Sequence, residues 1–272
     1  MQTAGWRLGP HESRLLTWAQ VRKVDCARSE NVAQALHLSG DQTTQLLSRM
    51  QKRGLIVQLQ RGLYLLPRNL PPGGKWTPAP ESILSHLMTV LRGDYQITGQ
   101  AAFHFHGLTD QVPNVLAVYN DKLSERKTIG KLAFEFIKVS PQRLGGVEEE
   151  RSPSSESPRR IGSLARTLMD AVYDYSRFGS LPKAYEWIAQ RKGDQNLLLQ
   201  LAEASVKFGN VATIRRIGCL LDLLNAPKRA IELLREAAPR TESFIPLLPA
   251  QSRKGSTSAE WGVIINYSIP HR

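Results

Sequence analysis

The chain has 272 residues, of which 41% are hydrophobic and 22% are charged, as in a globular protein with room for two domains. Its two cysteines, Cys26 and Cys219, stand far apart, and no apolar run is as long as a membrane span. This pattern argues against a disulfide framework, a structural zinc site and a membrane protein. The net charge of +12 favours a polyanion as partner.

The first part of the chain predicts three helices followed by a short β-ribbon. Apolar residues at helical spacing indicate helices over 12–24, from Ser29 onward and over 41–53. Two apolar, β-prone runs follow over 55–60 and 62–66. Three helices and a two-stranded ribbon in this order are typical of a winged helix-turn-helix.

The third of these helices is the predicted DNA-reading element. Its apolar face is formed by Thr43, Leu46, Leu47 and Met50. The residues predicted to contact DNA are polar or basic and lie away from that face or on the ribbon: Gln42, Thr44, Gln45, Ser48, Arg49, Lys52, Arg53 and Arg61. Gln can pair with adenine edges and Arg with guanine, whereas Arg53 and Arg61 suit phosphate or minor-groove contacts. The alternative is a winged helix that binds protein through a solvated polar face.

A linker and a larger domain are expected after the winged helix. Five prolines and two glycines fall within residues 67–80, so we place a linker at 68–79, between a DNA-binding domain of residues 1–67 and a second domain of residues 80–272. Residues 141–160 are rich in Ser, Pro and Glu, and we expect a mobile loop there. The predicted fold class is α+β: a winged helix-turn-helix followed by a mixed α/β domain with a helical back half.

Within the second domain, the pattern predicts helices, two clear strands and a closing strand. The helices are expected over 81–91, from Thr98 to Phe105, from Ser163 onward, and over about 181–191, 194–207, 210–224 and 227–237. The strands are expected at Val115–Tyr119, Leu132–Val139 and Gly262–Ile269.

The back of the chain is a second basic region. Residues 151–272 hold 18 Lys and Arg against 11 Asp and Glu. The candidate members of a second basic face are Arg159, Arg160, Arg166, Arg215 and Arg216. One reading is a set of solvated or ion-paired charges on helices, with Arg166 and Asp170 paired across one turn. The other is a face that extends the DNA footprint or meets another nucleic acid or nucleotide.

No catalytic, metal or cofactor site is expected. The sequence lacks the motifs of serine hydrolases, phosphate-binding loops and zinc proteases. His104 and His106 are discounted as metal ligands, because on the helix expected there the two side chains lie on different faces and no further Cys or His lies nearby.

Several short motifs, taken in order, resemble those of a known family. They are Arg61-Gly62-Leu63-Tyr64, Ile97-Thr98-Gly99-Gln100-Ala101-Ala102, His106-Gly107-Leu108 and Ile161-Gly162-Ser163-Leu164-Ala165-Arg166-Thr167-Leu168-Met169-Asp170. Over about residues 12–175 the chain resembles the AbiEi family, the antitoxin and autorepressor half of type IV toxin–antitoxin systems of bacterial phage defence. The resemblance implies an N-terminal winged helix that represses the operon promoter. It also implies a C-terminal domain that counters a nucleotidyltransferase toxin without a stable complex.

The sequence thus predicts a non-enzymatic transcriptional repressor with antitoxin function, in the bacterial cytoplasm and on the nucleoid when bound to operator DNA. One winged helix buries little surface, so we expect pairing on promoter inverted repeats, through a dimer or cooperatively. A first alternative is a stand-alone winged-helix regulator whose second domain senses a ligand or a protein partner. A second is an enzyme within residues 80–272.

Overall fold

The computed structural model describes residues 7–71, 73–151, 155–239 and 241–269. The fold mixes helices with several sheets, and the chain divides into two compact units. Unit 1 consists of Met1–Gly93, Glu125–Glu135 and Glu150–Arg159, and unit 2 of Asp94–Ser124, Phe136–Glu149 and Arg160–Arg272.

This division differs from the boundary expected at residues 68–79. The segment after the ribbon returns to unit 1, because the Trp76 amide donates to the carbonyl of Gly54 at 2.9 Å. Further along, the carboxylate of Glu81 is buried and lies 3.7 Å from the Arg159 guanidinium. The Pro- and Gly-rich stretch is therefore packed chain within a unit and not a spacer between two units.

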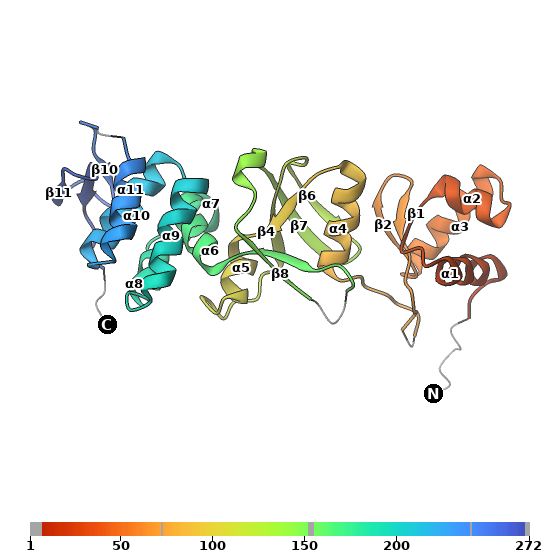
Figure 1. The fold of residues 1–272 in the computed structure, drawn as a ribbon. Coiled ribbons are helices and arrows are strands. Elements are labelled where there is room, and N and C mark those ends of the chain that lie inside the picture. Colours follow the sequence, from red (N-terminus) through yellow and green to blue (C-terminus); the bar gives the residue numbers. More distant parts are fainter. Residues whose placement is uncertain (1–6, 72, 152–154, 240, 270–272) are drawn as a thin grey trace. The chain divides into compact units, whose positions relative to one another are not determined.

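The N-terminal part of unit 1 combines three helices with a small sheet (Figure 1). The helices are α1 (Pro10–Arg22), α2 (Ser29–Leu36) and α3 (Gly40–Lys52), and the strands are β1 (Cys26–Arg28), β2 (Val57–Gln60) and β3 (Leu63–Leu65). The sheet is antiparallel with the order β1-β3-β2, and its register shifts between Gln58 and Gln60. The apolar faces of the three helices close over one core that includes Leu15, Val32 and Leu47.

Each end of α3 is closed by local hydrogen bonds. Ser39 accepts from the Gln42 amide at 3.3 Å, and the Gln42 side chain accepts from the Ser39 amide at 2.9 Å, which completes a capping box. At the other end, Gly54 takes a φ of +73° and donates to the carbonyl of Gln51. A positive φ is accessible to glycine without steric cost, so the chain can leave α3 and enter the ribbon.

Unit 1 also contains elements from further along the chain. These are α4 (Pro80–Leu91), β6 (Glu125–Ile129) and the first residues of β7 (Leu132–Lys138). Gly130 turns the chain between β6 and β7 with a φ of +62°. A Cβ added at Gly130 would lie 3.3 Å from a methyl group of Val57, so this turn packs closely on β2.

Strands from the middle of the chain form a six-stranded sheet of order β6-β7-β5-β4-β9-β8. Its other strands are β4 (Tyr95–Ile97), β5 (Val115–Asn120), β8 (Val147–Glu150) and β9 (Arg159–Gly162). In unit 2, β4 runs antiparallel to β5 and pairs in parallel with β9 through Ile97 and Ile161. The short helices α5 (Gly99–Phe105) and η1 (Pro141–Arg143) also belong to this unit.

The prediction of a mobile loop over residues 141–160 is wrong for most of that range. Its start holds η1 and β8, and its end holds β9. Residues 152–154 lie outside the described residues. The prediction relied on polar composition, but a strand at the edge of a sheet can also be polar. In β8 the side chains of Glu148, Glu149 and Glu150 are exposed.

The back half of unit 2 is helical, as expected. The helices are α6 (Leu164–Tyr173), α7 (Tyr175–Phe178), α8 (Lys183–Ala189), α9 (Gln195–Phe208), α10 (Val211–Leu223) and α11 (Lys228–Ala237). They enclose a large apolar core, which includes Leu168, Leu201 and Ile217. Figure 1 shows α9, α10 and α11 side by side, and α11 and α6 both contact α9.

The chain closes with a small sheet beside α10. Its strands are β10 (Ile245–Pro246), β11 (Ser256–Ser258) and β12 (Val263–Ile265), so the strand expected over 262–269 is shorter than predicted. Gly218 of α10 faces Trp261, and a Cβ at this glycine would collide with the indole ring. Among the described residues no helix has the length and apolar character needed to cross a bilayer.

Candidate nucleic-acid interface

One side of α3 forms a shallow concave surface of polar and basic side chains. We call it the α3 face; it is lined by Thr44, Gln45, Ser48, Arg49, Lys52 and Arg53. Gln45, Arg49 and Lys52 are exposed, whereas Leu46, Leu47 and Met50 on the other side of the helix are buried. The helical spacing of the sequence therefore predicted both sides of α3 correctly.

Two of the predicted contact residues already hydrogen-bond to the backbone of their own turn. The Gln42 side chain accepts from the Ser39 amide in the capping box. The Thr44 hydroxyl donates to the carbonyl of Gly40 at 2.9 Å. Gln42 is not among the residues that line the α3 face, and its side chain is engaged in the cap of the helix.

A buried carboxylate holds the two arginines of the α3 face. Glu12, in the first turn of α1, is 1% exposed. Its carboxylate accepts from the Arg53 guanidinium at 2.5 Å and lies 3.5 Å from Nε of Arg49. Arg53 also donates to the carbonyl of Arg7 at 2.7 Å. Arg53 is thus fixed against α1, while the Arg49 side chain remains 60% exposed.

Arg61 lies at the tip of the β2–β3 ribbon and is exposed. The neighbouring Gly62 has a φ of +74°, and its carbonyl accepts from the Ser29 amide at the start of α2. The tip is therefore anchored to the helical part of unit 1, and the Arg61 cation projects from a defined turn.

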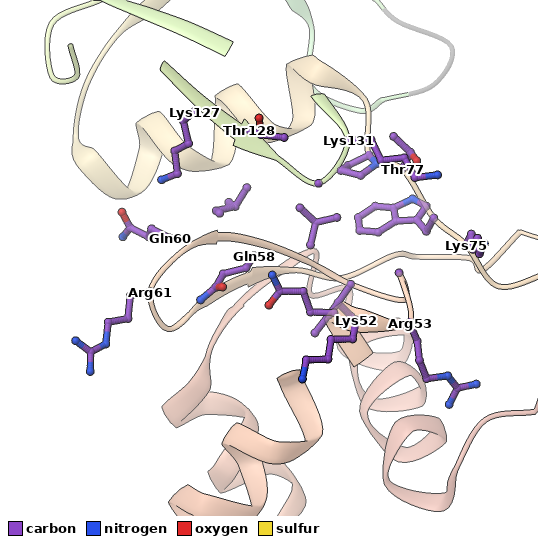
Figure 2. Close-up of a pocket in the computed structure, with 18 residues that line it drawn as sticks. Lys52, Arg53, Gln58, Gln60, Arg61, Lys75, Thr77, Lys127, Thr128 and Lys131 are labelled. Carbon is purple, nitrogen blue, oxygen red and sulfur yellow. The ribbon is translucent and has the colours of Figure 1, made fainter. Parts of the chain in front are cut away.

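Beside the ribbon lies a larger cavity of about 730 Å³, which we call the ribbon groove (Figure 2). Its walls come from the end of α3, from β2 and its tip, from residues 75–78 and from the β6–β7 turn. Six cations line it, namely Lys52, Arg53, Arg61, Lys75, Lys127 and Lys131, and none of the 18 lining residues is Asp or Glu. The groove is therefore a strongly positive surface.

Sequence reasoning missed half of these cations. Lys127 and Lys131 were assigned to the second domain, and Lys75 to a linker. The alternating pattern of residues 125–138 around Gly130 could have indicated a hairpin. No local signal, however, indicates that this hairpin packs against β2.

The prediction that Arg166 is part of a second basic face in the back of the chain is wrong. This side chain is fully buried and donates to Asp170 at 2.9 Å and to the carbonyl of Gly145 at 2.6 Å. The ion pair expected between Arg166 and Asp170 is confirmed. Arg143 joins it from η1, donating to Asp170 at 2.7 Å with its guanidinium 3.7 Å from the centroid of the Tyr173 ring.

Arg215 and Arg216 are also buried, at 5% and 7% exposure, and do not form a basic surface. Arg215 donates to the carbonyls of Trp261 and Ser243 at 2.7 and 2.6 Å, and Arg216 to that of Pro246 at 3.2 Å. Both cations thus bind the final segment of the chain onto α10. Because the guanidinium groups are buried, these carbonyls supply the acceptors that their N–H groups need.

The remaining two members, Arg159 and Arg160, are partly exposed but paired with acids. Arg159 lies 3.4 Å from Glu150, and Nε of Arg160 lies 3.1 Å from Glu149. Asp94 also pairs with Arg160. The five arginines of the expected second face are therefore used within the fold, and the α3 face and the ribbon groove are the exposed basic surfaces of interest.

Comparisons with known proteins concern the family and the fold. Residues 31–164 match the model of DUF6088, a family of unknown function. Among solved structures, the crystal structure of the RV2827C protein from Mycobacterium tuberculosis is similar with a TM-score of 0.59 and 16% sequence identity, over 96% of this chain and 93% of that one. At this identity the likeness describes the fold alone. No curated protein matches the sequence.

Proposed function

We propose that the N-terminal part of the chain is a winged helix-turn-helix that binds duplex DNA and represses transcription. In this proposal α2 and α3 form the helix-turn-helix, α3 enters the major groove, and the β2–β3 ribbon is the wing. The observation that carries the proposal is the α3 face: an exposed polar and basic surface without acidic residues, on a helix whose opposite side is buried.

The chemistry of the α3 face suits both parts of DNA recognition. Gln45 and Arg49 offer the amide and guanidinium groups that pair with adenine and guanine edges in the major groove. Lys52 and the ribbon-tip Arg61 suit phosphate contacts, which fix the register without reading sequence. Because a single module of this size buries little DNA, two copies on an inverted repeat are part of the proposal.

The test is duplex binding by the full chain, measured by fluorescence anisotropy. One duplex carries the native region upstream of the gene and the other a scrambled sequence of equal length. We expect the unaltered protein to prefer the upstream duplex. Gln45→Ala combined with Arg49→Ala should remove about 1–3 kcal/mol of that preference for each bidentate pairing with a base that the variant can no longer make.

A matched control changes an exposed Gln and an exposed Arg of the helical half, Gln200→Ala with Arg229→Ala. These changes remove the same groups and the same charge from unit 2, so they should leave the preference unchanged. Equal binding of both duplexes by the unaltered protein would refute sequence-specific reading by α3.

We further propose, from the resemblance to AbiEi antitoxins, that unit 2 counters a nucleotidyltransferase toxin encoded beside this gene. Growth during co-expression from unrelated promoters tests this function separately from repression. The full chain should restore growth, and so should the Gln45→Ala, Arg49→Ala variant, because neither residue belongs to unit 2. Failure of the full chain to restore growth would favour a stand-alone regulator.

A further inference from the structure

The ribbon groove joins residues that are far apart in the sequence. Its lower wall in Figure 2 carries Gln58, Gln60 and Arg61 of the ribbon, and the upper wall carries Lys127 and Lys131 of the β6–β7 turn. The turn belongs to unit 1 together with the ribbon, so both walls are part of one compact body.

The cations of the groove have few partners. Within the described part of the chain, no ion pair forms with Lys52, Arg61, Lys75 or Lys131. The ammonium group of Lys127 has a distant partner, the Glu125 carboxylate at 3.9 Å. The four cations without an ion pair repel one another, so the groove gains stability from an anion placed between its walls. Gln58, Gln60 and Thr128 add neutral donors that can bind phosphate oxygens.

The groove adjoins the α3 face. Lys52 and Arg53, at the end of α3, line both surfaces. The groove is partly open to solvent and holds about 730 Å³. A linear polyanion that lies on α3 can therefore continue into it, whereas an enclosed site would admit only a small molecule.

We infer that the ribbon groove seats one sugar–phosphate strand of the DNA duplex, and that Lys127 and Lys131 bind its phosphates from the side opposite the wing. The inference rests on the proposed DNA binding and adds to it a second basic element, the β6–β7 turn. The turn gives affinity without reading bases, because lysine side chains neutralise phosphates whatever the sequence.

The close packing of the turn on the ribbon makes this arrangement specific. A Cβ at Gly130 would lie 3.3 Å from a methyl group of Val57, closer than most side-chain contacts. The turn and the wing are therefore in contact within unit 1. A DNA strand bound between them is therefore contacted from two sides.

The decisive variant is Lys127→Gln with Lys131→Gln in the full chain, measured against the upstream and scrambled duplexes over a range of salt. Each phosphate that is no longer neutralised lowers the slope of log affinity against log salt by about 0.9. The slope of the double variant should therefore be smaller by about 2. A rise from about 50 to about 200 mM salt should then weaken it roughly tenfold less than the unaltered protein. Both duplexes should be affected alike.

Two controls separate this role from charge or folding. Lys228→Gln with Lys254→Gln removes the same charge from exposed positions in the helical half and should leave the slope unchanged. Lys127→Arg with Lys131→Arg keeps both cations and should preserve the slope. Hydroxyl-radical cleavage should show one backbone segment beside the α3 site that the unaltered protein protects and the Gln variant does not.

The outcomes distinguish the inference from the proposed function. If the unaltered protein binds DNA but the Gln variant keeps the full slope and footprint, the groove does not seat the duplex and the inference falls alone. If that variant instead loses binding of inorganic triphosphate or ATP, used as probes, the groove is a small-anion site and the inference is again overturned. If the unaltered protein binds neither duplex, both the inference and the proposed function fail.

Discussion

Glu12 and Arg53 form an ion pair that ties the first turn of α1 to the end of α3. The carboxylate is almost completely buried and also accepts from the Gly9 amide at 2.8 Å, so it caps α1 at the same time. Its second oxygen lies 3.5 Å from Nε of Arg49. One buried acid therefore sets the position of α3 relative to α1 and balances two cations of the α3 face.

Replacing Glu12 by Gln keeps the size of the side chain and removes its charge. We expect the free energy of unfolding to fall by about 1–3 kcal/mol, because a hydrogen bond to a charged group is removed from a buried place. Arg53 is about a third exposed, and water there should keep the reduction near the lower value. Urea denaturation of the variant measures it. The exposed Glu30→Gln in α2 serves as a control, and an equal effect of both changes would contradict a special role for the pair.

Replacing Arg61 by Ala should weaken DNA binding without changing sequence preference. The ribbon tip suits phosphate contact, so affinity for the upstream and scrambled duplexes should fall by the same factor, and the salt slope should decrease by about 1. Anisotropy titrations at several salt concentrations measure both quantities, with the exposed Arg229→Ala of α11 as control. A weakening confined to the upstream duplex would show instead that Arg61 reads bases.

Replacing Asp170 by Asn should destabilise unit 2 strongly. Burial lowers the pKa of both neighbouring arginines, and the Asp170 carboxylate raises it. For Arg143 the pKa is raised overall. For Arg166 the burial effect is the larger, and the pKa is lowered. Without the carboxylate, two buried guanidinium groups lose their shared counter-charge, a change that typically costs about 3–5 kcal/mol. Urea denaturation checks the prediction, with the exposed Asp222→Asn of α10 as control. A destabilisation no larger than that of the control would refute it.

The two cysteines should resist thiol reagents at neutral pH. Burial raises the pKa of Cys26 to about 11 and that of Cys219 to about 12, from 9.0. Both thiols therefore stay protonated at pH 8, and labelling with a disulfide reagent should be much slower than in urea. Labelling of Cys26, the more exposed of the two, should accelerate as the pH approaches 11.

The same pKa shifts have a consequence for stability. In the unfolded chain the thiols lose protons near pH 9.0, before they do so in the folded chain. The thiols' contribution to the free energy of unfolding is complete below that pH and is lost as the pH rises through the folded values. Cys26→Ala with Cys219→Ala should reduce the fall in stability between pH 9 and 11. An unchanged pH dependence would contradict the shifts.

Helix positions followed from local signals in the sequence. The spacing of Leu46, Leu47 and Met50 predicted the position of α3 and its two sides. These features could be predicted because each depends on residues within about two helical turns of one another. The contacts of Gln45 and Arg49 with DNA stay predictions of that pattern.

Burial of charge could not be predicted in the same way. Arg166, Arg215 and Arg216 sit on helices, where a cation is normally solvated, and local sequence gave no reason to place them inside. Their partners are Asp170 and backbone carbonyls, most of them supplied by distant segments. A helical arginine is buried only when such segments fold over it.

The amino-acid sequence by itself determined the helices, the ribbon and the excess of positive charge, since these depend on composition and short-range spacing. Tertiary structure alone decided which cations face solvent together. It buried three arginines of the expected second face and brought Lys127 and Lys131 into the groove that Arg61 also lines, more than 60 residues earlier in the chain. The physical reason is that the packing of Gly130 on Val57 and the supply of carbonyl acceptors are long-range contacts, which no local pattern encodes.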